Sequence, residues 1–154
     1  MHIALYQPDI PQNTGAILRL GACFGLPVHL IEPCGFDTSD RALRRAGLDY
    51  LAHAHIRRHR SFAAFDSWRR TQGLRLVLLT TRATMAFTDL RYRSTDLLML
   101  GRESCGVPEE VQQIADARVR IPMAAGMRSL NQAMAAAIAV SEALRQCDGF
   151  NDLA

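Results

Sequence analysis

IPMAAGMRSLNQAMAAAIAVSEALRQ, residues Ile121 to Gln146, joins a polar, glycine-bearing loop directly to the most apolar helical segment of the chain. Its many alanines favour a helix and allow close packing. Apolar residues recur in it at helical spacing and predict a buried face made of Leu130, Met134, Ala137, Ile138 and Leu144. We therefore expect a core helix packed against a sheet or a partner chain.

The polar lead-in to this helix has two interpretations. Arg128, Ser129 and Asn131 lie where a helix N-terminus offers unpaired N–H donors to an anionic or carbonyl-bearing ligand. Alternatively, Ser129 simply caps the helix. The local sequence leaves both interpretations open.

Length and composition predict a single domain over residues 1–154, since a chain of 154 residues buries roughly 68–70% of its unfolded surface without disulfide or metal support. The four cysteines form no CxxC pair and no zinc spacing, which favours isolated thiols in a reducing compartment and a cytoplasmic location. The N-terminal residues lack the pattern of a signal peptide, and no apolar run approaches about 18 residues. We expect neither export nor a membrane span.

The chain contains 18 arginines and no lysine. Lysine Schiff-base chemistry and a GxxxxGK[ST] phosphate loop are therefore excluded. Arginine binds phosphate well, so the arginines of the first half could form a nucleic-acid face, although a GC-rich coding sequence would place the same residues on an ordinary solvated surface. These residues are Arg41, Arg44, Arg45, Arg57, Arg58, Arg60, Arg69 and Arg70.

Strand and helix patterns alternate along the chain. The strand patterns cover residues 2–6, 28–31, 50–56, 74–81, 96–100 and 118–121, and the helix patterns cover 15–24, 41–46, 61–72, the segment after Pro108, and the alanine-rich stretch. In the 61–72 helix, Arg69 and Arg70 are expected to face outward. Such alternation predicts an open, mostly parallel α/β sheet that binds ligands at the carboxyl ends of its strands.

Three polar, glycine-bearing loops follow predicted strands and are expected to converge there: residues 80–83, 101–106 and 122–131. None is a GxGxxG loop, and Ser104 does not stand in a GxSxG nucleophile elbow. Arg19 follows the first predicted strand and either lies on the surface or faces this crevice. His53, His55 and His59 lack a nearby carboxylate or thiolate partner, so we expect a polar face there rather than a metal site.

Three segments resemble the motifs of the SPOUT RNA methyltransferases, in the same order and spacing. They are Asn13-Thr14-Gly15-Ala16-Ile17-Leu18-Arg19, Gly101-Arg102-Glu103-Ser104-Cys105-Gly106-Val107-Pro108, and Ile121-Pro122-Met123 followed by Arg128-Ser129-Leu130-Asn131. Segments between them, Ile31-Glu32-Pro33, Arg44-Arg45-Ala46-Gly47-Leu48-Asp49-Tyr50 and Leu79-Thr80-Thr81, are similar to the small tRNA (cytidine(34)-2'-O)-methyltransferase family. The similarity extends to about Gln146.

The resemblance implies an α/β domain with a C-terminal trefoil knot that binds S-adenosylmethionine and methylates the ribose of the wobble cytidine or uridine of tRNA. It carries the cofactor contacts to Leu79, Gly101, Ile121 and Ser129. It carries the catalytic site to Arg19, implied to act at the ribose and phosphate of the target nucleotide, with Asn13 and Glu103 beside it. The anticodon stem-loop is the implied partner, and no metal is implied.

The residue types suit this chemistry, because methyl transfer from a sulfonium needs positioning rather than a metal or a covalent intermediate. The three motifs contain no histidine, which favours an arginine-polarised hydroxyl or the RNA phosphate for removal of the ribose proton. The chain departs from many relatives at two places. Gln132-Ala133-Met134 replaces Leu-Ser-Asn after Asn131, and Ser141 replaces a frequent tyrosine.

A domain this small offers little surface for a tRNA arm, so we expect a symmetric homodimer in which arginines of one protomer complete the partner's site. Arg102, Arg128 and Arg145 are candidates. The alternatives are a non-catalytic RNA-binding protein of the same fold, a 2'-O-methyltransferase acting at another RNA site, and a small hydrolase that uses Ser104 or Cys105.

Overall fold

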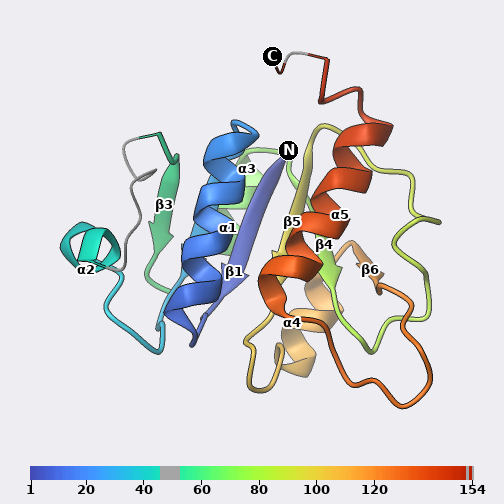
Figure 1. Ribbon diagram of the computed structural model, residues 1–154, viewed down its shortest axis with the longest axis horizontal. Helices are drawn as coiled ribbons and strands as arrows, with labels where there is room; N and C mark the ends of the chain where they lie inside the picture. Colours follow the sequence, from blue (N-terminus) through green and yellow to red (C-terminus); the bar gives the residue numbers. More distant parts are fainter. Residues whose placement is uncertain (46–52, 152, 154) are drawn as a thin grey trace.

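The computed structural model describes residues 1–45, 53–151 and 153, and it is organised around a parallel six-stranded sheet (Figure 1). The strand order is β3-β2-β1-β5-β4-β6, and each strand pairs in parallel with its neighbours. The strands are β1 (His2–Tyr6), β2 (Val28–Ile31), β3 (Ile56–His59), β4 (Arg75–Leu79), β5 (Asp96–Leu100) and β6 (Ala117–Val119). The predicted α/β class is confirmed.

Helices cover both faces of this sheet. On one face α1 (Pro11–Cys23) and α5 (Gln132–Gln146) lie side by side, and on the other lie α3 (Phe62–Thr71) and α4 (Glu109–Ile114), which are fainter in Figure 1. The short α2 (Asp40–Arg45) lies beyond the edge strand β3. Two clusters of buried side chains fill the two interfaces, because parallel strands bury both of their faces.

The predicted bounds differ most from the structure in two elements. The first helix begins at Pro11 rather than Gly15, since proline suits the first helical turn, where its missing N–H is not needed. The strand predicted over 50–56 is instead β3, which starts at Ile56 and pairs in register with Val28 of β2. Residues 46–52 lie outside the described residues. They include part of the strand predicted over 50–56, the end of the helix predicted over 41–46, and part of the family-like segment from Arg44 to Tyr50.

The buried face of α5 also differs from the prediction. Met134 and Ile138 were expected in the core, yet they are 60% and 38% exposed. The buried side chains of α5 are mainly small: Ala136, Ala139, Val140, Ala143 and Leu144. Small residues bring the helix close to the sheet and to α1, so the alanine face is the inner one, and Met134 and Ile138 lie on the outer side.

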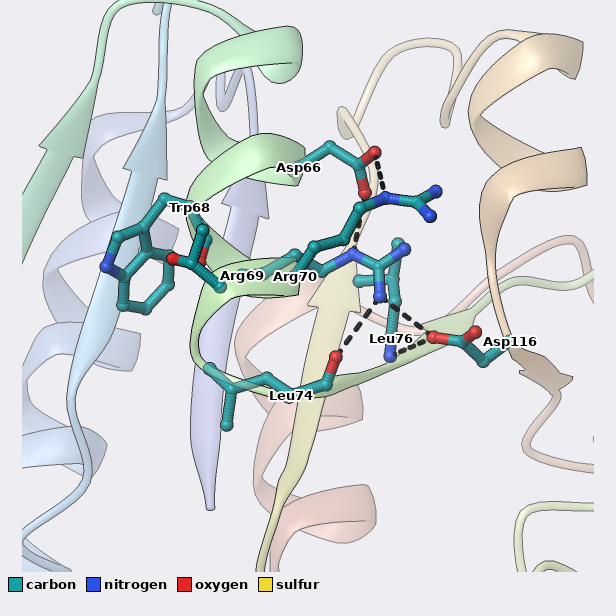
Figure 2. A network of polar contacts seen from close by, with 8 residues as sticks. Asp66, Trp68, Arg69, Arg70, Leu74, Leu76 and Asp116 are labelled. Carbon is teal, nitrogen blue, oxygen red and sulfur yellow. Dashed lines mark hydrogen bonds and ion pairs between the residues drawn. The ribbon is translucent and has the colours of Figure 1, made fainter.

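Arg69 was predicted on the outer side of its helix and is in fact 4% exposed. Its Nε donates to Asp66 Oδ1 at 2.7 Å, and its Nη1 donates to Asp116 Oδ2 at 2.9 Å and to the Leu74 carbonyl at 3.1 Å (Figure 2). Asp116 also accepts the N–H of Leu76 at 2.7 Å. The network ties α3 to the start of β4 and to the segment that leads into β6.

Three histidines on adjacent strands form a hydrogen-bonded row. His29 Nε2 lies 2.9 Å from His2 Nδ1, and His29 Nδ1 lies 3.0 Å from His59 Nε2. The Trp68 ring packs against all three imidazoles. Burial is the main cause that lowers the pKa of His29 to about 3, and the neighbouring His2, His59 and Arg57 side chains add to the effect. His29 is therefore neutral at physiological pH.

Candidate active site

A cavity of about 480 Å³ opens at the carboxyl ends of β4, β5 and β6, at the lower edge of the sheet in Figure 1. The three loops predicted to converge all contribute to its wall. All four predicted cofactor contacts line it: Leu79, Gly101, Ile121 and Ser129. This is the position expected for a ligand site in a parallel α/β sheet.

The loop after β5 is a tight hairpin that shapes one wall of the cavity. The N–H groups of Arg102 and Gly106 each donate to the other residue's carbonyl at 2.9 Å. A Cβ on Gly101 would lie 2.7 Å from the Gly106 carbonyl carbon, so only glycine fits at Gly101. The hairpin itself therefore requires glycine at this position.

The tip of this hairpin is held by the loop between β1 and α1. Glu103 Oε2 accepts the N–H of Asp9 at 3.1 Å, and the N–H of Glu103 donates to Asp9 Oδ1 at 3.2 Å. The hydroxyl of Ser104 donates to the second oxygen of the same Asp9 carboxylate. Asp9 and Glu103 thus fasten two loops that are 94 residues apart in the sequence.

The two carboxyl groups differ in their electrostatics. Burial, and then the neighbouring Asp9 side chain, raise the pKa of Glu103 above its ordinary value. The pKa of Asp9 falls to about 2, first through its hydrogen bond with Glu103 and then through the Ser104 hydroxyl and the Glu103 N–H. Asp9 is therefore ionised at neutral pH, and Glu103 titrates closer to neutral pH than Asp9 does.

Asn13 connects the hairpin to the start of α5. Its Nδ2 donates to Glu103 Oε1 at 3.2 Å, and its Oδ1 accepts from Asn131 Nδ2 at 2.8 Å. Asn131 is also the N-cap of α5, since its Oδ1 accepts the N–H groups of Ala133 and Met134. The capping role considered for Ser129 was wrong, and Ser129 lies in the cavity wall instead.

Gln132, the first residue of α5, is 8% exposed and lines the cavity. Its Nε2 donates to the Gly101 carbonyl at 2.7 Å. Its Oε1 is buried and has no hydrogen-bond partner among the residues that the structure describes. The cavity wall therefore contains an unused acceptor next to the backbone of Gly101.

Arg19 does not join this group. It is an exposed residue of α1, two turns beyond Asn13, and it is not part of the cavity wall. Arg102 lines the cavity, and its Nε donates to the Gln7 carbonyl at 3.1 Å. Of the predicted catalytic residues, the structure brings Asn13 and Glu103 together at the cavity and leaves Arg19 outside its wall.

Sequence reasoning missed Asp9 and the two amide residues Asn131 and Gln132 as members of one hydrogen-bonded site. Asp9 stands between two prolines in the loop after β1, and that position at a strand's carboxyl end was the available signal. Asn131 was noted only as part of the polar lead-in. Gln132 was noted only as a departure from the pattern of relatives.

His53 and His55 are exposed, and no cluster of three potential metal ligands occurs in residues 1–45, 53–151 and 153.

The geometry around Ser104 does not favour the hydrolase alternative. Ser104 donates to the carboxylate of Asp9 rather than to a base of the Ser–His type, and none of the described residues in the cavity wall is a histidine. No helix in the described part of the chain is both long and apolar enough to span a membrane.

Comparisons with known proteins agree on the family of this chain. Residues 1–141 match the model of the SpoU rRNA Methylase family. A protein of Ancylobacter novellus named tRNA (cytidine(34)-2'-O)-methyltransferase is 55% identical over 96% of this chain and 94% of its own length.

Two solved structures add to the comparison. One, described as structural insights into the 2-OH methylation of C/U34 on tRNA, has a TM-score of 0.87 and 45% identity, and 94% of each chain is covered. An AdoMet-bound rRNA methyltransferase from Sinorhizobium meliloti has a TM-score of 0.82 and 29% identity over 94% of this chain and 55% of that one. By the match over its first 141 residues and by these relatives, the chain belongs to the SpoU methylase family.

Proposed function

We propose that this protein is a tRNA 2'-O-methyltransferase that transfers the methyl group of S-adenosylmethionine to the ribose of nucleotide 34, a cytidine or uridine. The observation that carries this proposal is the hydrogen-bonded chain from Asp9 through Glu103 and Asn13 to Asn131, which joins the loop after β1, the loop after β5 and the start of α5 beside one cavity. The near-full-length similarity to an enzyme named for this reaction supports the choice of substrate.

The cavity suits the cofactor. Apolar side chains from the ends of β4 and β5 and from Ile121 offer a surface for the adenine ring. Gly101 and the two amide residues at the start of α5, Asn131 and Gln132, lie in the same cavity wall. Leu79, Gly101, Ile121 and Ser129 would hold the cofactor, which supplies an electrophilic methyl group on its sulfonium.

The polar end of the cavity would receive the target ribose. Glu103 accepts hydrogen bonds on both carboxyl oxygens, an arrangement that keeps its carboxylate at a set position beside Asn13. Arg19 is proposed to act on the ribose and the adjacent phosphate from outside the cavity wall. We expect Arg19→Ala to lose most turnover while the dissociation constant of adenosylhomocysteine stays unchanged, and unchanged turnover would remove Arg19 from the site.

We also propose that the chain forms a homodimer whose partner arginines, with Arg102, Arg128 and Arg145 as candidates, extend the RNA-binding surface. Met134 and Ile138 support this proposal, because they form an exposed apolar pair on the outer side of α5 at a spacing of four residues. Light scattering coupled to gel filtration is expected to give twice the mass of one chain. A monomer that methylates tRNA at the full rate would contradict the dimer.

The trefoil knot belongs to the same proposal. The segment between β6 and α5 is inferred to thread through a loop, so that Gln132 reaches Gly101 and Asn131 reaches Asn13. The chain would act as a single domain over residues 1–154 in the cytoplasm, where its tRNA substrate is found.

The direct experiment is incubation with labelled S-adenosylmethionine and unmodified tRNA, followed by nuclease digestion and mass spectrometry. One methyl group on the ribose of nucleotide 34 is the expected product. Label at a different RNA position would favour the alternative of another 2'-O site, which the rRNA enzymes among the structural neighbours make worth testing. RNA binding without adenosylhomocysteine release would favour the non-catalytic RNA-binding alternative.

A further inference from the structure

We propose that a second cavity, at the carboxyl ends of β1 and β5, binds a backbone phosphate of the RNA substrate through Tyr6, Arg82 and Arg102. This inference rests on the proposed function and names the residues that would hold the RNA beside the cofactor. The cavity has a volume of about 320 Å³.

The position of the second cavity follows from the strand order. The chain runs from β1 through α1 to β2 and from β5 through α4 to β6, so it leaves the neighbouring strands β1 and β5 in opposite directions. The helices α1 and α4 also lie on opposite faces of the sheet (Figure 1). Ligands of open α/β sheets bind in the crevice at such a switch point. Tyr6 and Gln7, at the end of β1, and the hairpin after β5 line the second cavity there.

The second cavity adjoins the first. Five residues line both cavities: Arg82, Arg102, Cys105, Gly106 and Val107. A ligand of the second cavity would therefore lie next to a cofactor bound in the first. An RNA strand whose target ribose enters the first cavity can place a neighbouring phosphate in the second.

Arg102 has hydrogen-bonding capacity left for a ligand. Its Nε donates to the Gln7 carbonyl at 3.1 Å, which anchors the guanidinium at the wall of the second cavity. Its two terminal nitrogens have no acceptor among the described residues. Gln7 itself has a φ of 45°, which is uncommon for a residue other than glycine, and such backbone strain is concentrated at functional sites.

Tyr6 adds a hydroxyl group to the same wall. The residue is 7% exposed, yet its hydroxyl has no hydrogen-bond partner in the described chain. It is also not one of the fully enclosed hydroxyls without a partner, which are those of Thr14 and Tyr92. Burial raises the pKa of Tyr6, and the charge of the nearby Arg102 acts in the opposite direction. The hydroxyl and the Arg102 guanidinium therefore lie close together.

The unpaired charges at this wall favour an anion. Arg82 is exposed, and its one hydrogen bond in the described chain runs from its backbone N–H to the Thr80 hydroxyl. Glu109 lines the cavity, and Glu110 contributes to the raised pKa of Tyr6. Neither carboxylate forms an ion pair with Arg82 or Arg102 among the residues that the structure describes.

Two guanidinium groups and a phenol hydroxyl suit a phosphodiester. The guanidinium fork matches the geometry of phosphate oxygens, and a charge-assisted hydrogen bond is stronger than a neutral one. RNA carries such a group at every nucleotide. Arg102, a candidate for the RNA surface of the partner, is thereby assigned a contact within its own chain.

The test measures the affinity for a tRNA anticodon stem-loop at several salt concentrations. Arg82→Met and Arg102→Met should each bind about tenfold more weakly than the wild type, because a hydrogen bond to a charged group is lost. Each should also lower the slope of log affinity against log salt by about 0.7 to 0.9, the value for one neutralised phosphate. Tyr6→Phe keeps the ring and should weaken binding without changing this slope.

Neutral linkages identify the phosphate. One stem-loop carries an uncharged methylphosphonate before nucleotide 34 and another carries it after that nucleotide, each with a 2'-deoxyribose preceding the linkage. Stem-loops with the same deoxyribose and an ordinary phosphate are the references. We expect the wild type to lose affinity at one of the two linkages and Arg102→Met to lose none there, because the contact is already absent.

A matched control removes the same charge elsewhere. Arg91→Met replaces an exposed arginine of the segment between β4 and β5, outside both cavity walls, and should bind the stem-loop as the wild type does. Adenosylhomocysteine should bind Arg82→Met and Arg102→Met with the wild-type dissociation constant in calorimetry. Thermal melts report the fold, and Arg82→Met keeps the test valid if loss of the Gln7 contact disturbs Arg102→Met.

The outcomes are distinct. Wild-type RNA affinity and salt slope in both arginine variants would overturn the phosphate site while leaving the proposed function intact. Weaker binding of adenosylhomocysteine with unchanged RNA affinity would also overturn it, and would assign the arginines to the cofactor carboxylate. Failure of the wild-type protein to bind the stem-loop and adenosylhomocysteine would overturn the proposed function and the inference together.

Discussion

Asn131 Nδ2 donates to Asn13 Oδ1 at 2.8 Å, a contact between residues 118 positions apart that joins the start of the last helix to the start of the first. The same Asn131 side chain caps α5 through its Oδ1. The Asn131 amide therefore has two roles. It caps the N-terminus of α5, and it holds Asn13 in position to contact Glu103.

These two roles can be separated by substitution. Asn131→Ala loses both and should destabilise the protein by about 1 kcal/mol, the usual cost of a lost N-cap, seen as a lower midpoint in urea. Asn131→Asp keeps the capping oxygen but loses the donor to Asn13. We expect nearly wild-type stability and a clearly reduced kcat for the aspartate variant, and full activity in it would show that the link to Asn13 is dispensable.

The Asp9–Glu103 pair predicts a change in the pH profile. Asp9 contributes to the raised pKa of Glu103, so Asp9→Asn should bring the Glu103 pKa closer to its ordinary value. Activity that needs the Glu103 carboxylate is lost as pH falls through the Glu103 pKa, and the acidic limb of kcat/KM should therefore move to lower pH in the variant. A limb that stays in place would show that Glu103 does not set it.

The Arg69 network predicts a large effect on stability far from the cavity. Arg69→Met leaves Asp66 and Asp116 without their shared cation, which costs about 3–5 kcal/mol for a fully buried pair and less here, about 2–3 kcal/mol, because Asp116 is 45% exposed. Arg70→Met is the matched control, since Arg70 is 61% exposed and also contacts Asp66. Its expected cost is below about 1 kcal/mol by urea denaturation.

The histidine row predicts how stability depends on pH. The folded-state pKa of His29 is lowered to about 3, so the unfolded chain binds more protons than the native state below the ordinary value of 6.5. Stability is therefore fully present above pH 6.5 and is lost towards pH 3, by up to about 1.4 kcal/mol per pH unit for one proton. His29→Leu should flatten this part of the urea-denaturation profile, and a profile as steep as that of the wild type would contradict the role of His29.

The fold was predictable where the pattern was local. Three strands, β1, β2 and β5, have the predicted bounds, because each is a mainly apolar run that ends at a loop. The inner face of α5 was not predictable from side-chain size, since close packing against α1 selects its alanines and leaves Met134 outside. Arg69 is buried against its acceptors Asp66 and the Leu74 carbonyl, and its third partner, Asp116, comes from a segment 47 residues away that no local pattern reveals.

The site was predictable to the level of loops. Polar residues after parallel strands indicated the cavity, and Leu79, Gly101, Ile121 and Ser129 do line it. The hydrogen bonds of Asp9 and Gln132 depend on distances between loops that are remote in sequence, which no local pattern contains. For Arg19, the position within its motif did not indicate that the residue lies outside the cavity wall.

The proposed methyl acceptor is the ribose 2'-oxygen of nucleotide 34. Two anticodon stem-loops that differ only in having a ribose or a 2'-deoxyribose at this cytidine can be compared, with transfer from labelled S-adenosylmethionine as the measurement. We expect one methyl group per molecule for the ribose form and none for the deoxy form. Equal labelling of both forms would show that the 2'-oxygen is not the acceptor.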